Sequence, residues 1–414
     1  MSVLQGFRAI IFIVPPPLQI EGIMDEDLIT SRVQEIMQEY ARVTGLEPVS
    51  DPPKRYLWTD AFAVCNYLEL FHRTHDAGWR NLAERLVSQV HYSLGKHRKD
   101  DTRKGWISGL SEEEGGLHPT KGGIRIGKPL NERKPREHYD DRLEWDQDGQ
   151  YFHYLTKWMH ALNRMSMVTR EQRYNQWAIE LAQAAFAGFV YLSPSGGTPR
   201  MYWKMSIDLS RPLVPSMGQH DPLDGFITFS ELQATAARDF GQSHRLYLNT
   251  EIAELASICR GAGIATDDPL GLGGLLADAV KAAQLMAGAG GGYAGLLESI
   301  LNAAAPGVRE FANGDTLRMP PEYRLAFREL GLSIGLAGTH NLAMLIEGNP
   351  GVFAGAGHLK ENVRALASFT PLGNAIIEFW MDERSQTAVT WTAHREINMV
   401  MLATSLAPGG FLLI

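Results

Sequence analysis

The sequence predicts an all-α fold in which inner and outer helices alternate around a closed ring of helical hairpins. Two kinds of helical pattern support this fold class. Segments 27–43 and 76–97 carry one apolar stripe and a charged back, which is typical of an outer helix that faces water. Four other segments are apolar on most sides, as expected for buried inner helices: 58–71, 222–236, 325–346 and 389–404. Further helices are predicted near 171–191, 243–262, 269–288, 293–305 and 359–384, with few strands.

Chain length and the N-terminal sequence indicate the domain organisation. A chain of 414 residues with 44% hydrophobic content can bury a large core, and length alone would suggest two domains. The helical pattern instead predicts one ring-shaped domain over residues 25–414. Residues 1–24 are predicted to be an arm that docks on this domain. Their apolar run, 9–14, is short, ends in three prolines and lacks the cationic lead of a secretory signal.

Charge and cysteine content exclude several classes of partner. The formal net charge of -8 and the isoelectric point near 5.9 argue against nucleic acid or an anionic membrane, which require a basic face. Cys65 and Cys259 are the only cysteines, so no disulfide framework is predicted and a reducing cytoplasm fits. We predict no metal and no cofactor, because His72 and His75 have metal-like spacing but no carboxylate partner. No apolar run approaches the roughly 20 residues of a membrane helix. The sequence leaves a homo-oligomer open.

The most informative stretch is 144–154, where carboxylates, aromatics and amides lead into a strongly patterned helix. From Tyr151 onwards the apolar positions have helical spacing, which places Asp146 and Asp148 at the N-terminus of that helix. Such residues either cap the helix or act as the acid and base of a hydrolytic site. The neighbouring aromatics Trp145 and Tyr151 favour a functional site over a solvated loop.

Two long insertions are expected to border the same site. Segments 99–149 and 193–220 each come directly before a predicted inner helix, and Asp60 opens another. Because the inner helices of such a ring run parallel, these segments should meet at one mouth. Helix N-termini would add partial positive charge there, which favours anions and carboxylates.

Three motifs resemble the acidic and aromatic helix openings of a known group of enzymes. They are Arg55-Tyr56-Leu57-Trp58-Thr59-Asp60, Glu144-Trp145-Asp146-Gln147-Asp148-Gly149-Gln150-Tyr151 and His220-Asp221-Pro222-Leu223-Asp224-Gly225. The group is the six-hairpin (α/α)6 toroid enzymes, which include glycoside hydrolases, unsaturated uronyl hydrolases and N-acylglucosamine 2-epimerases. By pattern, the resemblance extends from about residue 55 to residue 403. It implies an all-α (α/α)6 toroid with long loops on one face and a sugar or another small polar molecule in the funnel.

The candidate catalytic residues are acids and histidines at predicted helix openings. Asp146 or Asp148 would act as general acid or base and Asp60 as the partner carboxylate, unless Asp60 only caps its helix. His220 and His394 could instead exchange a proton with a carbon beside a carbonyl. A satisfied histidine in a helix core is the simpler interpretation of His394.

The candidate substrate-binding residues are aromatics, cations and polar groups: Tyr151, Trp203, Lys204, His118, Arg125, Lys128, Asp221 and His340. The aromatic rings would stack on a sugar ring, and the cations would hold a carboxylate group. His118, Arg125 and Lys128 belong to the glycine-rich loop 116–128, which is either a functional lid or a mobile surface loop.

We therefore predict a cofactor-independent carbohydrate-active enzyme that hydrolyses a small glycoside by carboxylate acid–base catalysis. Both neutral and anionic glycosides fit this prediction. A sugar epimerase or isomerase that uses histidine proton transfer is the first alternative. A lyase or dehydratase of a non-sugar alcohol and a non-catalytic helical binding module are further alternatives. The segment 140–144 also resembles the acidic magnesium-diphosphate motif of terpene synthases, but the sequence offers no second metal-binding motif.

Overall fold

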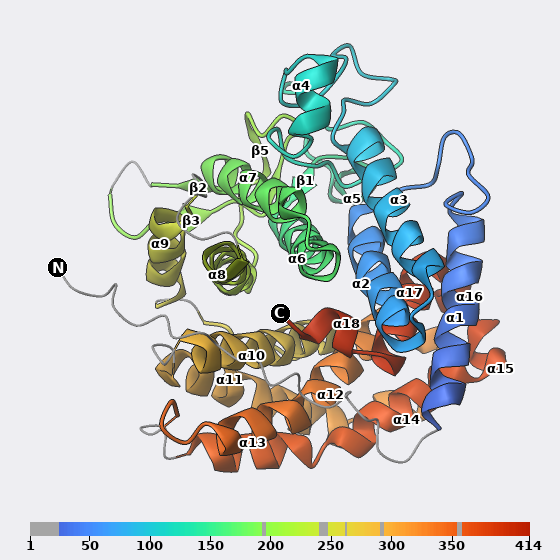
Figure 1. The fold of residues 1–414 in the computed structure, drawn as a ribbon, viewed down its shortest axis with the longest axis vertical. Coiled ribbons are helices and arrows are strands. Elements are labelled where there is room, and N and C mark those ends of the chain that lie inside the picture. The colour runs from blue at the N-terminus through green and yellow to red at the C-terminus, as the bar shows by residue number, and fades with distance from the viewer. Residues whose placement is uncertain (1–24, 193–195, 240–246, 261–262, 290–293, 354–357) are drawn as a thin grey trace. The chain divides into compact units, whose positions relative to one another are not determined.

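The computed structural model describes residues 25–414 apart from 193–195, 240–246, 261–262, 290–293 and 354–357. The described chain is mainly helical, as predicted (Figure 1). It separates into two compact units, one of residues 30–263 and one of residues 264–414 with the chain before residue 30. The predicted N-terminal arm, residues 1–24, lies outside the described residues, and a single domain over 25–414 stays a prediction.

The unit 30–263 is built from helical hairpins in which an inner helix packs against an outer one. Three inner helices contact one another in chain order: α2 (Leu57–Thr74), α6 (Phe152–Thr169) and α8 (Asp221–Asp239). Their outer partners are α3 (Ala77–Leu94), α7 (Gln172–Phe189) and α9 (Asn249–Cys259), respectively (Figure 1). The preceding helix, α1 (Glu26–Val43), is joined to α2 by the hydroxyl of Tyr67, which donates to the carbonyl of Met37.

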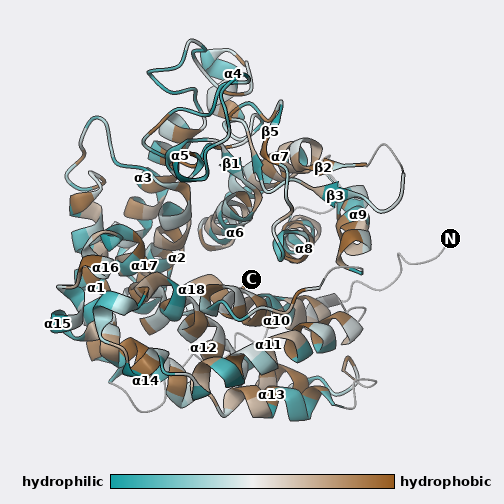
Figure 2. Cartoon of the chain, turned by 180° about the vertical axis from the view of Figure 1, so that it is seen from behind, coloured by the Kyte–Doolittle hydropathy of each residue, from teal (hydrophilic) through white to brown (hydrophobic). Residues whose placement is uncertain are grey.

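The predicted inner helices of this unit are buried on nearly every side. Every residue of α2 from Leu57 to Leu70 is buried, and so is every residue of α8 from Asp221 to Leu232. The outer helix α3 instead buries one stripe, which includes Trp79. Figure 2 shows that the loops next to α4 (Glu112–Leu117) are mainly hydrophilic. The alternation of apolar and striped helices is therefore confirmed in this unit.

Short strands join the two long insertions. β1 (Gln150–Tyr151), β4 (Lys204–Met205) and β5 (Pro212–Val214) form an antiparallel sheet in which Tyr151 pairs with Lys204. A second antiparallel pair is formed by β2 (Val190–Tyr191) and β3 (Arg200–Met201). The short helix α5 (Asp141–Asp146) directly precedes β1. Because β1 follows the first insertion and β4 belongs to the second, the two insertions meet, as the sequence predicts.

The unit 264–414 is also built from packed helices. α10 (Pro269–Ala289) lies against α12 (Ala326–Gly348), and α11 (Ala294–Asn313) packs on α10. α12 also contacts α13 (Leu359–Ala367), α14 (Thr370–Met381) and α17 (Arg395–Leu406). Shorter helical turns complete the unit: η2 (Thr316–Arg318), η3 (Pro321–Tyr323), α15 (Glu383–Gln386), α16 (Val389–Thr392) and α18 (Gly409–Leu412).

Two long helices predicted in this unit are broken. The segment 359–384 divides into α13 and α14, because Pro371 has no N–H and cannot continue the hydrogen-bond ladder of α13. The segment 389–404 divides into α16 and α17, with His394 in a non-helical conformation before α17. Pro306, by contrast, does not end α11, which extends to Asn313.

α10 is long and apolar enough to cross a membrane, by length and composition alone. The expectation that no segment approaches such a composition is therefore too strict. Because 72% of the most apolar part of α10 is buried within the protein, its apolar surface is explained by helix packing.

Glycines bring α10 and α12 into backbone contact. A Cβ added at Gly273 would collide with the carbonyl group of Gly331 and with the backbone of Leu332. A Cβ at Gly335 would lie 2.7 Å from the carbonyl oxygen of Gly273. Gly274, one residue further along α10, faces open space. A side chain at Gly273 would therefore push the two helices apart, because the colliding atoms belong to the backbone.

Gly273→Ala is expected to lower the free energy of unfolding by roughly 1–3 kcal/mol, as overpacked cores typically do. Gly274→Ala is the matched control, since it adds the same methyl group to the same helix and should gain up to about 1 kcal/mol of helix propensity. Urea unfolding followed by circular dichroism measures both variants. Equal stabilities would contradict the backbone contact.

Candidate active site

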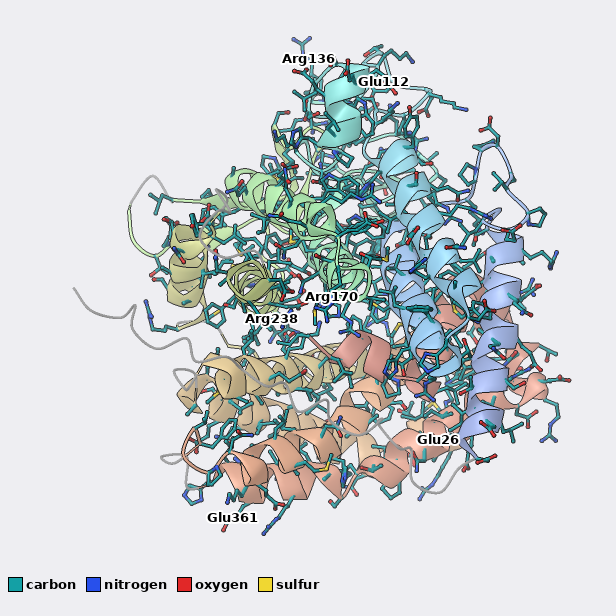
Figure 3. All side chains as sticks on the ribbon, viewed as in Figure 1. Glu26, Glu112, Arg136, Arg170, Arg238 and Glu361 are labelled. Atoms are coloured by element: carbon teal, nitrogen blue, oxygen red, sulfur yellow. The ribbon has the colours of Figure 1, made fainter. Side chains whose placement is uncertain are left out.

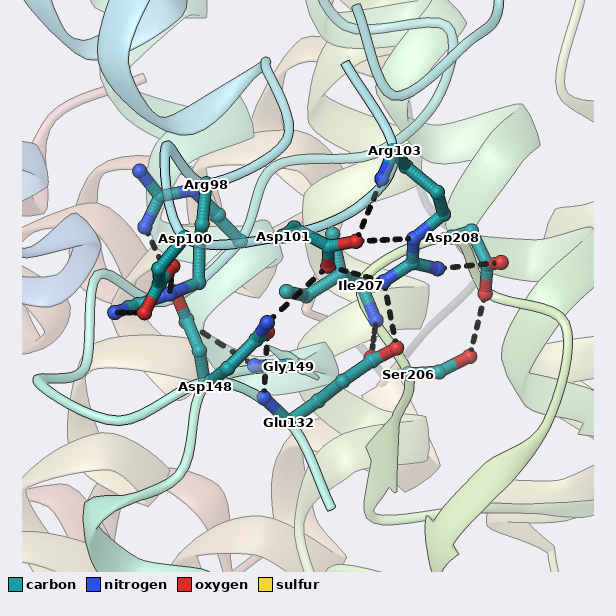
Figure 4. A network of polar contacts seen from close by, with 12 residues as sticks. Arg98, Asp100, Asp101, Arg103, Glu132, Asp148, Gly149, Ser206, Ile207 and Asp208 are labelled. Atoms are coloured by element: carbon teal, nitrogen blue, oxygen red, sulfur yellow. Dashed lines mark hydrogen bonds and ion pairs between the residues drawn. The ribbon is translucent and has the colours of Figure 1, made fainter. Parts of the chain in front are cut away.

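Ion pairs hold the two insertions together next to the candidate site (Figure 4). The Arg103 guanidinium lies 2.8 Å from Asp101 and 2.7 Å from Glu132, both in the first insertion. It also lies 2.8 Å from Asp208, in the second insertion. Glu132 accepts a hydrogen bond from the backbone N–H of Ile207, which adds a further link. One guanidinium therefore connects segments about a hundred residues apart in the chain.

The Asp148 carboxylate is fully buried and surrounded by donors (Figure 4). It accepts hydrogen bonds from Arg125 Nη1 at 2.7 Å and from the backbone N–H groups of Gly127 and Gly149 at 3.0 and 3.1 Å. Arg98 Nη1 lies 3.4 Å away. Arg125 also donates to two backbone carbonyls. Both the predicted acid Asp148 and the predicted anion ligand Arg125 therefore have partners inside the chain.

Asp60 is buried at the start of α2 and is also fully partnered. Its Oδ1 accepts hydrogen bonds from Tyr40 Oη at 2.7 Å and from Arg55 Nη1 at 3.1 Å. Its Oδ2 accepts from the backbone N–H of Tyr56 at 2.9 Å, so the carboxylate secures the opening of its own helix. Burial raises the pKa of Asp60, and Arg55 opposes the rise. This geometry fits the capping alternative for Asp60.

Lys204 anchors the end of α5 to strand β4. Its fully buried Nζ donates to the backbone carbonyls of Glu144 and Gln147 at 2.7 and 2.9 Å. It also lies 2.9 Å from the Glu144 carboxylate, which pairs with Arg133 at 3.1 Å. Burial lowers the pKa of Lys204, and the Glu144 carboxylate opposes this effect. The lysine is therefore held by the protein itself.

Aromatic rings gather where α2, α6 and the second insertion meet. We call this group the aromatic cluster; it comprises Tyr56, Trp58, Tyr151, His153, Tyr154 and Trp203, with Trp145 at its edge. The hydroxyl oxygens of Tyr56 and Tyr154 are 2.6 Å apart. Burial raises the pKa of Tyr56 to about 12, so this phenol stays protonated at neutral pH. The cluster thus combines apolar faces with hydroxyl groups.

His153, in the first turn of α6, is the titratable member of the aromatic cluster. Its ring lies 5.4 Å from Tyr151 and 6.5 Å from Trp203, nearly parallel to both. Its Nδ1 is 3.4 Å from Oδ1 of Asp221, the first residue of α8. His153 Nδ1 and Asp221 Oδ2 are both buried, and neither forms a hydrogen bond within the part of the chain that the structure describes. The His153 side chain is 26% exposed and that of Asp221 only 6%, so the imidazole reaches solvent and the carboxylate does not.

Lys128 places a positive charge beside the same rings. Its Nζ lies 5.5 Å from the ring centre of Tyr56 and 6.0 Å from that of Trp145. Burial lowers the pKa of Lys128, as does the charge of Lys204, whereas Asp146 opposes the shift. Among the described residues Lys128 forms no ion pair. Asp146 itself is exposed at the end of α5. The ammonium group is thus available to a ligand at the aromatic cluster.

The remaining predicted residues are spread over the chain. His220 is half-buried directly before Asp221. His118 lies 2.7 Å from Glu180 of α7. His394 and His340 belong to the unit 264–414, and both are exposed, so helix-core packing does not account for them. No group of three or more potential metal ligands occurs in the described ranges.

The structure brings together Tyr151, Trp203, Asp221 and Lys128 from the predicted set. It adds His153, Trp58 and Tyr154, which are not among the predicted site residues. No signal in the sequence marks His153, because its place in the site depends on Asp221, a residue on another helix. Trp58 is adjacent to Thr59 and Asp60 in a motif that was singled out, so its position was the one available signal.

No protein-family model and no curated protein matches the chain. Its structure is similar to that of a GH76 alpha-mannanase from Bacteroides thetaiotaomicron, with a TM-score of 0.51 and 8% identity over 94% of this chain and 97% of that chain. The chain has the six-hairpin (α/α)6 toroid fold. This confirms the resemblance predicted from the three motifs and the all-α fold class.

Two further solved structures are less similar. One is an inactive variant of an alpha-1,6-mannanase of Salegentibacter sp., with a TM-score of 0.49, 10% identity and coverage of 93% of this chain and 99% of that chain. The other is cellobiose 2-epimerase from Spirochaeta thermophila, with a TM-score of 0.46, 14% identity and coverage of 91% and 97%. At such identities the similarity shows a common fold alone and does not indicate which reaction the chain catalyses.

Asp148→Asn is expected to lower the free energy of unfolding by about 3–5 kcal/mol, because it leaves the arginines around it without their buried counter-charge. The matched control is Asp146→Asn, which makes the same change two residues away at an exposed position and should cost less than about 0.5 kcal/mol. Chemical denaturation measures the difference. Equal stability of the two variants would contradict the buried position of Asp148.

Proposed function

We propose that this protein is a carbohydrate-active enzyme whose substrate binds at the aromatic cluster. The observation that carries the proposal is the pairing of His153 with Asp221 among aromatic rings. Rings such as Trp203 suit the apolar C–H faces of a sugar, and the hydroxyl groups of Tyr56 and Tyr154 suit its polar edge. The toroid fold is compatible with this function but does not by itself indicate a reaction.

In this proposal His153 transfers the proton. A carboxylate beside one imidazole nitrogen fixes the tautomer and stabilises the imidazolium that forms during the reaction. Asp221 faces Nδ1, so Nε2 is the atom that exchanges a proton with the substrate. The exposed fraction of His153 allows a substrate to reach it, while Asp221 stays protected from water.

The reaction class that we favour is isomerisation or epimerisation of a reducing sugar. His153 would remove the hydrogen on the carbon next to the carbonyl, and the electrons of that C–H bond would form the carbon–carbon double bond of an enediolate. The Lys128 ammonium group would stabilise the negative oxygen. Proton return to the other carbon, with transfer of the remaining hydroxyl proton from one enediolate oxygen to the other, gives the isomer. Return to the same carbon from the opposite face gives the epimer, and His220, which adjoins Asp221, is the candidate donor.

Glycoside hydrolysis, favoured from the sequence, is the second candidate. It needs one protonated and one ionised carboxyl group that both reach the substrate. The carboxylate oxygens of Asp60 and Asp148 accept hydrogen bonds from groups of the protein itself. This weakens the prediction that these two residues act as the catalytic acid and base. Asp221 Oδ2 has no hydrogen bond within the described residues, and Asp146 is exposed. These two carboxylates carry the hydrolytic alternative. A cytoplasmic location also stays part of the proposal, because a chain with only two cysteines fits a reducing compartment.

Incubation of reducing sugars in deuterium oxide distinguishes the two reactions. We expect deuterium on the carbon beside the carbonyl of one sugar in a panel of aldoses and ketoses, detected by NMR and mass spectrometry. His153→Ala should slow this exchange by about 100-fold or more, the usual effect of losing an acid–base catalyst. Asp221→Asn should slow it less and shift its pH profile, because Asp221 acts through the imidazole.

The matched control for His153→Ala is His358→Ala, which removes an exposed histidine of the unit 264–414 and should leave the exchange rate unchanged. Thermal unfolding checks that each variant is folded. Release of a reducing sugar from a glycoside, with oxygen from labelled water in the product and no carbon-bound deuterium, would replace isomerisation by hydrolysis. Full exchange in folded His153→Ala would refute the assigned role of this residue.

A further inference from the structure

A concave surface lies away from the aromatic cluster in the unit 30–263. A cavity of about 220 Å³ opens between α3, α7 and the loop that leads through α4, and it shares no lining residue with the aromatic cluster. Its walls include the rings of Tyr92, Trp106 and Trp177. Its other polar groups come from Glu84, Ser88, His91, Arg173 and Tyr174. The cavity is not lined by Asp148, His153 or Asp221.

The protein holds the walls of this cavity in place without a ligand. Trp177 Nε1 donates a hydrogen bond to the carbonyl of Leu117 at 2.8 Å, and the hydroxyl of Thr120 donates to the carbonyl of Trp177 at 2.7 Å. Trp106 is 2% exposed and packs so closely on Gly115 that a Cβ there would collide with the indole. A preformed site of this kind loses little conformational freedom when a ligand binds.

Tyr92 is also held in place, and cations of the protein already lie over the aromatic rings. Glu112, marked at the start of α4 in Figure 3, lies 2.8 Å from Tyr92 Oη and 2.5 Å from Lys96 Nζ. Lys96 Nζ lies 3.8 Å from the ring centre of Tyr92 and 4.6 Å from that of Trp106. The Arg173 guanidinium lies 5.6 Å from the ring centre of Trp177. Because the chain supplies these cation–π partners itself, a cationic ligand is disfavoured.

The polar groups around the cavity indicate a neutral ligand with many hydroxyl groups. Glu84 accepts hydrogen bonds, Arg173 donates them and Ser88 can do both, so the two charges have opposite sign. The aromatic walls suit a ligand with apolar C–H faces. The volume is below the roughly 300–1,000 Å³ of sites for drug-sized ligands, which limits the occupant to about one ring. A neutral pyranose combines all of these properties.

We propose that this cavity is a second carbohydrate-binding site, which holds one neutral pyranose unit and takes no part in catalysis. The inference is independent of the reaction carried out at the aromatic cluster. It rests on the cavity, its fixed aromatic walls and its balanced polar groups.

Isothermal titration calorimetry of the full chain with glucose, mannose, galactose and N-acetylglucosamine tests the proposal. Titration of Trp203→Ala isolates this cavity, because that change removes a ring of the aromatic cluster. At least one sugar should still bind this variant. Adding Gly116→Phe should weaken that binding at least ten-fold, since Gly116 lines the cavity and a Cβ there meets open space. Tyr92→Ala, which removes one wall, should have a similar effect.

The matched control is Gly295→Phe, another glycine-to-phenylalanine change at a helical position where a Cβ meets open space. It should leave sugar binding unchanged. If no sugar binds folded Trp203→Ala, or if Gly116→Phe and Tyr92→Ala leave its binding intact, the cavity is not a sugar site. Binding of tetramethylammonium or indole in place of every sugar, with loss in Gly116→Phe, would also overturn the assigned ligand class.

Discussion

Pairing of buried charge is the constraint on which the arrangement of the unit 30–263 depends. Asp60, Glu144 and Asp148 are removed from water, and each has at least one arginine or lysine as partner. Removing a charge from water costs several kcal/mol per ion unless another group compensates it. The buried pair of Glu144 and Lys204 joins the two long insertions, and the half-buried pair of Arg103 and Asp208 does the same. The two long insertions therefore adopt one mutual arrangement or leave charges uncompensated.

This arrangement also orders the rings of the aromatic cluster. Strand β1 carries Tyr151 and pairs with β4, which directly follows Trp203, so the ion pair of Lys204 with Glu144 fixes both aromatic residues. His153 comes two residues after Tyr151 and lies in the first turn of α6, which packs on α8, where Asp221 is found. Charges with a structural task thus surround a histidine and a carboxylate that retain unused hydrogen-bonding capacity.

Most of the helices could be predicted from the sequence because their signal is local. The all-apolar segments around α2, α8 and α12 and the striped segments around α1 and α3 report burial through a period of 3.6 residues. The break at Pro371 has a visible cause in the sequence, whereas the break at His394 has none. The short strands were missed because two-residue pairings leave no periodicity.

Functional roles were less predictable because they depend on which partners surround a side chain. Asp146 and Asp148 look alike in sequence, yet one is exposed and the other accepts hydrogen bonds from Arg125 and two backbone N–H groups. Sequence position likewise could not show that His153 meets Asp221. Tyr151 and Trp203 were recognisable from residue type, and their rings lie together in the structure. Their role in substrate binding stays a prediction.

The glycine contact between α10 and α12 has a consequence for how these helices align. Gly331 and Gly335 are one helical turn apart on α12, and both face Gly273 or its neighbours on α10. A shift of α12 along its axis by one turn, about 5.4 Å, would bring a side chain against a backbone that accepts none. Two apolar helices with ordinary side-chain packing can align in several ways along their axes. The glycine contact is compatible with one such alignment of α10 and α12. The glycines at this contact therefore fix the position of α12 along α10.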